Sequence, residues 1–235
     1  MKADRSAEEW EEFADALAFL GNSLLLPISM TAPVGLDPAF WASFHGFDDE
    51  AVSSAAEGLC AWIAERFGSS AEQLVRDVSV EYTRLFVGPP APLAPPWETM
   101  NGAAETSVGF GEATFQMKQL IRDAGLAFVG QNRQYEDHMG IELLYASELA
   151  RRIAAGESGE RLDADGALRE NGEGPAAAAP PALPVHSVTP EQLRTFLADH
   201  PLKWIGTLKE RVAEAAPDGY YLCLLQLADA LMRAL

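Results

Sequence analysis

Cysteine and basic residues are scarce in this chain, and each shortage excludes a class of protein. The two cysteines, Cys60 and Cys223, lie far apart and offer neither a disulfide framework nor a CxxC pair for zinc. We expect both to be buried free thiols in a reducing compartment. Lys and Arg total 17 against 35 Asp and Glu, which gives a net charge of −18. Nucleic acid and anionic membrane surfaces are therefore not expected as partners, because both require basic patches.

Long apolar runs are also missing. The N-terminal segment MKADRSAEEWEEF is too acidic for the basic start of a signal peptide. The apolar stretch that follows is interrupted by Gly21, Asn22, Pro27 and Ser29, so it cannot span a bilayer. We therefore expect a soluble cytoplasmic protein without membrane insertion, and the negative charge favours partners that are at least partly basic.

Helical spacing of apolar residues is present instead, and it continues through almost the whole chain. Ser6 with Glu9, and Thr189 with Gln192, are the residue pairs of capped helix starts. No segment alternates apolar and polar residues in the way of a half-buried strand. The sequence predicts an all-α, single-domain helical bundle over residues 1–235.

Two regions carry more detailed predictions. A helix is expected over about 112–125 with Phe115, Ile121 and Leu126 facing inward, and Asp137 is placed to cap the helix that follows it. The stretch 156–188 contains GEGPAAAAPPALP and cannot bury enough apolar surface to order itself. We expect this stretch to be a flexible insertion between two helices.

Catalytic signatures are absent: there is no GxGxxG, Walker, GxSxG or HExxH motif. We expect no enzyme activity, no metal and no cofactor. Asp137, His138 and Glu142 do place a histidine among carboxylates, with His138 and Glu142 one helical turn apart. Two ligands on one turn do not complete a metal site. A metal-dependent hydrolase centred on His138 and Glu142 is kept as an alternative.

The segment EYTRLFVGPPAPLAPPWET, from Glu81 to Thr99, sets large apolar side chains beside a stiff proline-rich loop. The simplest interpretation is that Tyr82, Leu85 and Phe86 belong to the core. Trp97 is different, because a proline-rich loop normally runs over the protein surface. A tryptophan held there beside carboxylates suits a groove for an apolar peptide.

This segment closely resembles the signature of the TorD/DmsD family, cytoplasmic chaperones for molybdenum-cofactor reductases. DHMGIEL, from Asp137 to Leu143, is similar to a second family block, and FLADHPLKW, from Phe196 to Trp204, to a third. The chain departs from the family pattern at Thr99 in place of serine, Glu136 in place of proline and Pro201 in place of leucine.

The resemblance implies an all-helical protein that binds the twin-arginine signal peptide of a DMSO/TMAO-type reductase. It implies that the apo-reductase catalytic subunit is held in the cytoplasm until its molybdopterin cofactor is inserted. The chain would be a monomer or a domain-swapped dimer. A helical adaptor without a signal-peptide groove remains a further alternative. The implied signal-peptide site consists of Tyr82, Leu85, Phe86, Pro96, Trp97, Glu98, Asp137 and His138, with Glu81 as a further carboxylate for the arginines.

Overall fold

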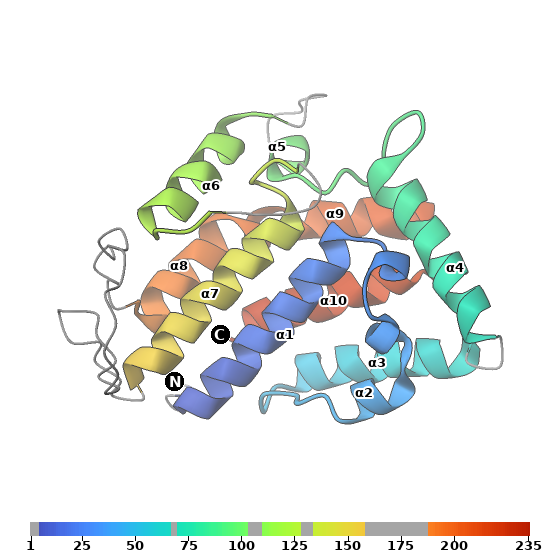
Figure 1. Cartoon of the computed structure of the whole chain (residues 1–235), viewed down its shortest axis with the longest axis horizontal. Coiled ribbons are helices and arrows are strands. Elements are labelled where there is room, and N and C mark those ends of the chain that lie inside the picture. The colour runs from blue at the N-terminus through green and yellow to red at the C-terminus, as the bar shows by residue number, and fades with distance from the viewer. Residues whose placement is uncertain (1–4, 67–69, 103–109, 128–133, 158–187) are drawn as a thin grey trace, which may run out of the picture.

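A computed structural model describes residues 5–66, 70–102, 110–127, 134–157 and 188–235. Over these residues the chain is all-α, as predicted (Figure 1). They contain no β-strand, and a single isolated bridge joins Trp97 to His138. The expected insertion at 156–188 lies outside the described residues except at its two ends.

The α-helices of the described residues are α1 (Ala7–Leu25), α2 (Pro38–Ala42), α3 (Glu50–Arg66), α4 (Ala71–Tyr82), α5 (Glu98–Asn101), α6 (Glu112–Asp123), α7 (Met139–Glu157), α8 (Pro190–Asp199), α9 (Pro201–Ala215) and α10 (Tyr220–Arg233). Shorter turns are the 3-10 helices η1 (Ile28–Met30) and η2 (Pro33–Leu36), and the π-helical turn η3 (Thr83–Val87).

Both predicted capping boxes are confirmed. The Ser6 hydroxyl accepts from the backbone N–H of Glu9, whose carboxylate accepts from the N–H of Ser6. Thr189 and Gln192 exchange the same pair of bonds at the start of α8, where Pro190 occupies the first helical position. These local bonds satisfy N–H groups that a helix leaves without partners at its start.

Helices α1 and α7 pack side by side along their length (Figure 1). Their closest approach is at Gly21 and Gly140. A Cβ atom on Gly21 would lie 2.7 Å from the carbonyl oxygen of Gly140, and a Cβ on Gly140 would lie 2.6 Å from that of Gly21. The two backbones therefore meet at a separation that only glycine permits at both positions.

The C-terminal helices complete the core. Helix α10 packs against α3 and α9, α8 packs against α7 and α9, and α5 packs between α6 and α9. One hydrophobic cluster runs from Trp10 in α1 to Ala234, just past α10, and Trp204, Tyr220 and Tyr221 are among its largest fully buried side chains. The first and last helices thus share a core, and the short α5 rests on its edge.

Two predictions about burial were wrong. Phe115 is 54% exposed, whereas Ile121 is buried and Leu126 half-buried. The inward face of α6 is formed by Thr114, Met117 and Ile121 instead, so the residue directly after Thr114 turns outward. Both cysteines are free thiols as expected, but half-buried rather than buried. Among the described helices, none combines the length and the apolarity that crossing a bilayer requires.

Candidate functional site

The first family block begins with side chains that belong to the core. The hydroxyl of Tyr82 donates to the carbonyl oxygen of Leu25 over 2.8 Å, and Leu85 is fully buried. The Phe86 ring meets the Tyr82 ring at 5.4 Å, edge to face. Peptide contact by Tyr82, Leu85 and Phe86 stays a prediction, and all three are buried in the structure described.

Glu81, at the start of this block, is engaged by the last helix. Its two carboxylate oxygens accept from the backbone N–H groups of Tyr220 and Tyr221 over 3.1 and 3.0 Å. Anionic groups at this position stabilise a helix, because the N–H groups of its first turn have no partner within it. The structure therefore uses Glu81 as a cap for α10.

The proline-rich loop leaves η3 at Gly88, whose φ of 91° is a left-handed conformation that favours glycine. The loop returns to the body of the protein at Pro96 and Trp97. The N–H of Met139 donates to the Pro96 carbonyl over 2.9 Å, and the N–H of Glu98 donates to the Asp137 carbonyl over 2.9 Å. The Pro-Trp-Glu segment is thus bound, antiparallel, to the residues that open α7.

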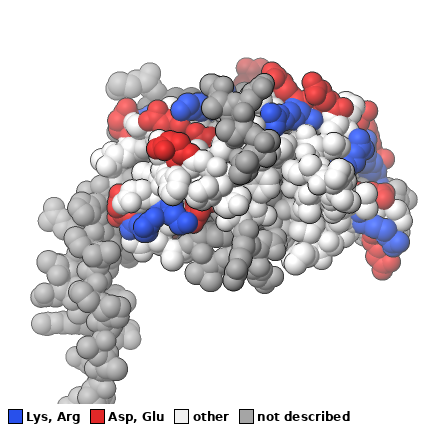
Figure 2. Space-filling model, turned by 90° about the horizontal axis from the view of Figure 1, so that it is seen from above, with Lys and Arg blue, Asp and Glu red and all other residues white. Residues whose placement is uncertain are grey.

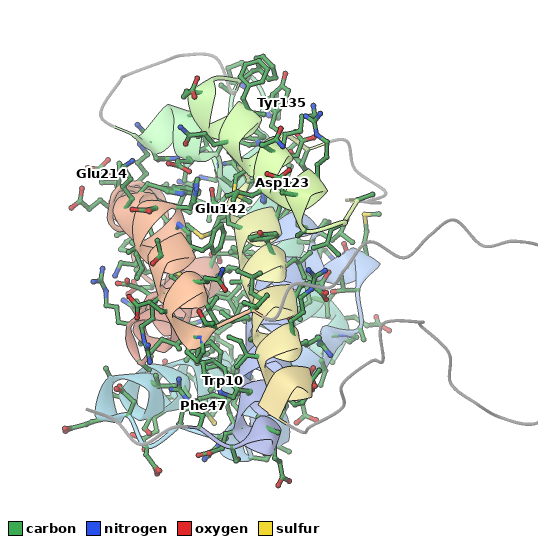
Figure 3. The ribbon with its side chains drawn as sticks, turned by 90° about the vertical axis from the view of Figure 1, so that its left-hand side faces the viewer. Trp10, Phe47, Asp123, Tyr135, Glu142 and Glu214 are labelled. Carbon is green, nitrogen blue, oxygen red and sulfur yellow. The ribbon has the colours of Figure 1, made fainter. Side chains whose placement is uncertain are left out.

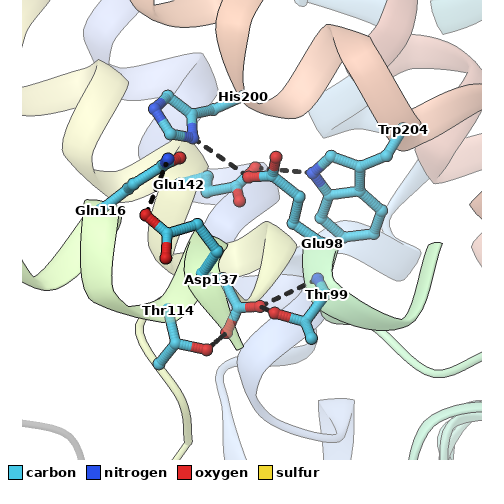
Figure 4. A network of polar contacts seen from close by, with 9 residues as sticks. Glu98, Thr99, Thr114, Gln116, Asp137, Glu142, His200 and Trp204 are labelled. Atoms are coloured by element: carbon cyan, nitrogen blue, oxygen red, sulfur yellow. Dashed lines mark hydrogen bonds and ion pairs between the residues drawn. The ribbon is translucent and has the colours of Figure 1, made fainter. Parts of the chain in front are cut away.

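Asp137 forms hydrogen bonds to α5 and α6 and does not cap α7. The predicted role of Asp137 as a helix cap was therefore wrong. One of its carboxylate oxygens accepts from the Thr99 backbone N–H at 3.0 Å and from the Thr99 hydroxyl at 2.5 Å. The other accepts from the Thr114 hydroxyl at 3.0 Å (Figure 4). The carboxylate is fully buried. Asp137 therefore fixes α5 and α6 to the segment before α7.

His138 provides the local bond at the start of α7. Its Nδ1 accepts from the Gly140 N–H over 3.0 Å, so Nδ1 carries no proton. Burial lowers the pKa of His138 to about 3, and the ring is neutral with its proton on Nε2. That Nε2 is buried and has no hydrogen-bond partner among the described residues. The indole Nε1 of Trp97 is also buried and has no hydrogen-bond partner among the described residues. The centre of the Trp97 ring lies 6.0 Å from that of the His138 ring.

A second buried network joins α5, α7 and the α8–α9 junction. The Glu98 carboxylate pairs with His200 Nδ1 over 3.0 Å, and Trp204 Nε1 donates to the Glu142 carboxyl over 3.0 Å (Figure 4). In Figure 3, Glu142 lies in the interior between α7 and the C-terminal helices. The three sequence blocks therefore converge on one buried region, although Glu98 and His200 are 102 residues apart.

Glu98, Glu142 and His200 could also offer ligand atoms to a metal, because one such atom from each lies within 4.8 Å of the others. The raised pKa of Glu142 is a second property of this group. Burial raises it well above its usual range, and the negative charge of Glu98 raises it further. Both causes favour the protonated form of Glu142. The ligand group found among the described residues does not include His138, on which the hydrolase alternative was centred.

The raised pKa of Glu142 predicts how stability depends on pH. Above its ordinary value of 4.5 the residue is ionised in the unfolded chain but protonated in the folded chain, so its contribution to stability is complete below about pH 4.5 and declines as pH rises. Glu142→Gln removes this titration. From pH 5 to 7 we expect wild type to lose up to about 1.4 kcal/mol per pH unit relative to the variant. Urea unfolding at several pH values measures this difference, and parallel pH profiles would contradict it.

Sequence reasoning placed Trp97, Glu98, Asp137 and His138 in the site, and the structure brings these four together. The sequence analysis did not place Thr114, His200 and Trp204 in the site. A signal was present, since His200 and Trp204 are four residues apart and so share one helix face. Their partners lie in other blocks, however, and only the fold brings these together.

Comparison with known proteins relates this chain to a family of known description. The family model described as nitrate reductase delta subunit matches residues 47–210. A protein named Tat proofreading chaperone DmsD from Salmonella typhi is 38% identical over 95 residues, which is 40% of this chain and 44% of that protein. The same values hold for the protein of that name from Salmonella typhimurium. A probable Tat proofreading chaperone DmsD from Haemophilus influenzae is 30% identical over 77 residues, which is 37% of its length.

The chain thus aligns with less than half of the length of these relatives. The family model covers far more, since it extends from the loop before α3 to α9 and includes all three sequence blocks. Because that match spans more than half of the chain, the protein belongs to the nitrate reductase delta subunit family, in which the TorD/DmsD chaperones are found.

Proposed function

We propose that this protein is a cytoplasmic chaperone that binds the twin-arginine signal peptide of a molybdopterin-containing oxidoreductase. Its partner would be the apo-form of the catalytic subunit, held back from export until the cofactor is inserted. Family membership and the names of the DmsD relatives support a role in the maturation of redox enzymes. The signal peptide as ligand is supported by two buried donors of the site.

The observation that carries the proposal is a pair of buried N–H donors. Trp97 Nε1 and His138 Nε2 have no acceptor among the described residues, although their rings are in contact. A buried donor without an acceptor costs about 1–3 kcal/mol. Peptide carbonyl groups are acceptors of the right kind, and an apolar peptide would also cover the half-buried Trp97 ring. Both nitrogen atoms are buried, so a peptide carbonyl would reach them only after the Trp97 loop shifts, and it would then supply the missing acceptors.

The site residues divide into two roles under this proposal. Trp97 would contact the peptide, and His138, which is fully buried, would do so only after the Trp97 loop shifts. Glu98 and Asp137 would position the loop, since their carboxylates are buried and hydrogen-bonded within the protein. Pro96 would fix the loop through its carbonyl bond to the N–H of Met139. Tyr82, Leu85 and Phe86 would support the loop from the core.

Trp97→Ala is expected to weaken peptide binding by about 2 kcal/mol, or roughly 30-fold in affinity, as is typical of an aromatic hot spot. Trp97→Phe keeps a six-membered ring but removes the pyrrole ring with its N–H, so we expect a smaller loss than in Trp97→Ala. The measurement is calorimetric titration with a synthetic peptide that carries two adjacent arginines followed by an apolar segment.

Urea unfolding of the same variants shows whether the fold survives, because Trp97 is half-buried and contributes some packing. Equal affinity of wild type and Trp97→Ala would remove Trp97 from the site. Failure of wild type to bind the peptide, together with absence of a reductase subunit after co-purification from the native host, would reject the proposed function.

A further inference from the structure

An aromatic strip extends outward from the candidate site over α6. We define this strip by Trp97, Tyr135, Phe110 and Phe115. The Trp97 and Tyr135 rings lie 6.4 Å apart, Tyr135 and Phe110 5.4 Å apart, and Phe110 and Phe115 5.0 Å apart. The inner end of the strip touches His138 through Trp97. The rings therefore form a continuous row that begins at the buried donors.

The outer three rings of the strip are accessible. Phe110 is 42%, Tyr135 43% and Phe115 54% exposed. In Figure 3, Tyr135 lies at the outer end of the molecule beside α6. Figure 2 looks onto this end and shows acidic and basic residues interspersed with uncharged ones. Aromatic side chains gathered in one exposed row, rather than scattered singly, are typical of an interaction surface.

Charge beside the strip indicates what kind of partner it accepts. Glu112 is exposed and lies one turn before Phe115 on α6, so the two side chains share a face. Glu136, next to Tyr135, is paired with Lys118 over 3.3 Å. Asp137 and Glu98 are engaged in the buried networks. The Glu112 carboxylate accepts a hydrogen bond from the exposed Gln116 amide over 3.3 Å and has no ion pair among the described residues, so it is placed beside Phe115 to meet an arginine from outside.

We propose that the aromatic strip binds the apolar segment of the client's signal peptide and that Glu112 faces its arginines. This inference rests on the proposed function and adds to it three rings, Phe110, Phe115 and Tyr135, that lie outside the three family blocks. An apolar segment beside a basic one matches a row of rings beside a carboxylate. A membrane as occupant is disfavoured, because the chain has a net charge of −18.

The test is calorimetric titration of the full chain with the peptide described above. The Phe110→Ser, Phe115→Ser double variant is expected to lose about tenfold or more in affinity. The control is the Val80→Ser, Val87→Ser double variant, which changes two valines of similar exposure, 62% and 57%, on α4 and η3. We expect its affinity to stay within about twofold of wild type, as for residues outside an interface.

Glu112→Gln separates the charge contribution. We expect it to weaken binding of the arginine peptide about threefold, in the range of an exposed ion pair, and to leave binding of an otherwise identical peptide with glutamines unchanged. Equal effects on both peptides would overturn the role given to Glu112.

The outcomes also distinguish the two proposals. If wild type binds the peptide and the phenylalanine double variant binds equally well, the strip proposal fails and the proposed function stands. If wild type does not bind the peptide, the strip proposal fails, and co-purification from the native host decides whether the proposed function fails with it. Sedimentation analysis tests whether a second copy of the chain occupies the strip. If wild type is a dimer and the phenylalanine substitutions dissociate it while peptide affinity is unchanged, the strip is a dimer interface.

Discussion

Replacing Asp137 with alanine is expected to lower the free energy of unfolding by about 3 kcal/mol. The substitution removes the acceptor of three hydrogen bonds from Thr99 and Thr114 inside the protein. Loss of a buried acceptor costs more than the hydrogen bonds themselves contribute, because the donors stay buried without a partner. The same change releases α5 and α6 from the start of α7, so we expect weaker peptide binding as well.

Two further variants test this account of Asp137. Glu136→Ala removes the neighbouring carboxylate, whose ion pair with Lys118 is partly exposed, and we expect a loss below about 1 kcal/mol. Asp137→Asn keeps the shape but sets an amide NH2 where an oxygen accepted hydrogen bonds, so it should fall between the two. Urea unfolding provides the three values. A loss in Asp137→Ala no larger than in Glu136→Ala would show that the buried network contributes little.

Gly140→Ala is expected to destabilise the protein by about 3 kcal/mol, or to prevent folding. The added Cβ would lie 2.6 Å from the Gly21 carbonyl oxygen and 2.7 Å from Leu25 Cγ. The carbonyl belongs to the backbone of α1 and cannot rotate away as a side chain does. Helices α1 and α7 must therefore separate, which opens packing along their whole contact.

Helix α7 also supplies the control for this prediction. Gly156 is exposed on the same helix, and a Cβ there would meet nothing within 4 Å. Gly156→Ala should stabilise the protein by about 0.5–1 kcal/mol, because alanine is the better helix former. Thermal unfolding of both variants shows the contrast. Similar midpoints for Gly140→Ala and wild type would mean that the helices can move apart without cost.

The fold was predictable because its signals are local. Ser6, Glu9, Thr189 and Gln192 define helix starts within four residues of sequence, and the structure confirms each of them. The resemblance of the three blocks also indicated which segments share a site. Neither inference required knowledge of which helices are neighbours in space.

The details of the site could not be predicted in the same way, because they depend on partners distant in sequence. Asp137 precedes a helix and has the side chain of a cap, yet Thr99 and Thr114 offer it better donors from other elements. Its own helix start is served by His138. Phe115 fits an inward pattern, but the buried row of α6 begins one residue earlier, at Thr114.

The bond between Glu98 and His200 has a consequence for synthesis of the chain. Glu98, at the end of the loop that carries Trp97, is made early, but its partner His200 follows about a hundred residues later. A growing chain can begin to fold from its N-terminus, and this loop can bind the residues before α7, yet the bond from Glu98 to His200 cannot form until α9 begins to emerge. Closing so long a loop is also slow compared with forming the helices. A ribosome-bound chain that ends before residue 200 should therefore have helices in place but lack the bond from Glu98 to His200 that completes the buried network.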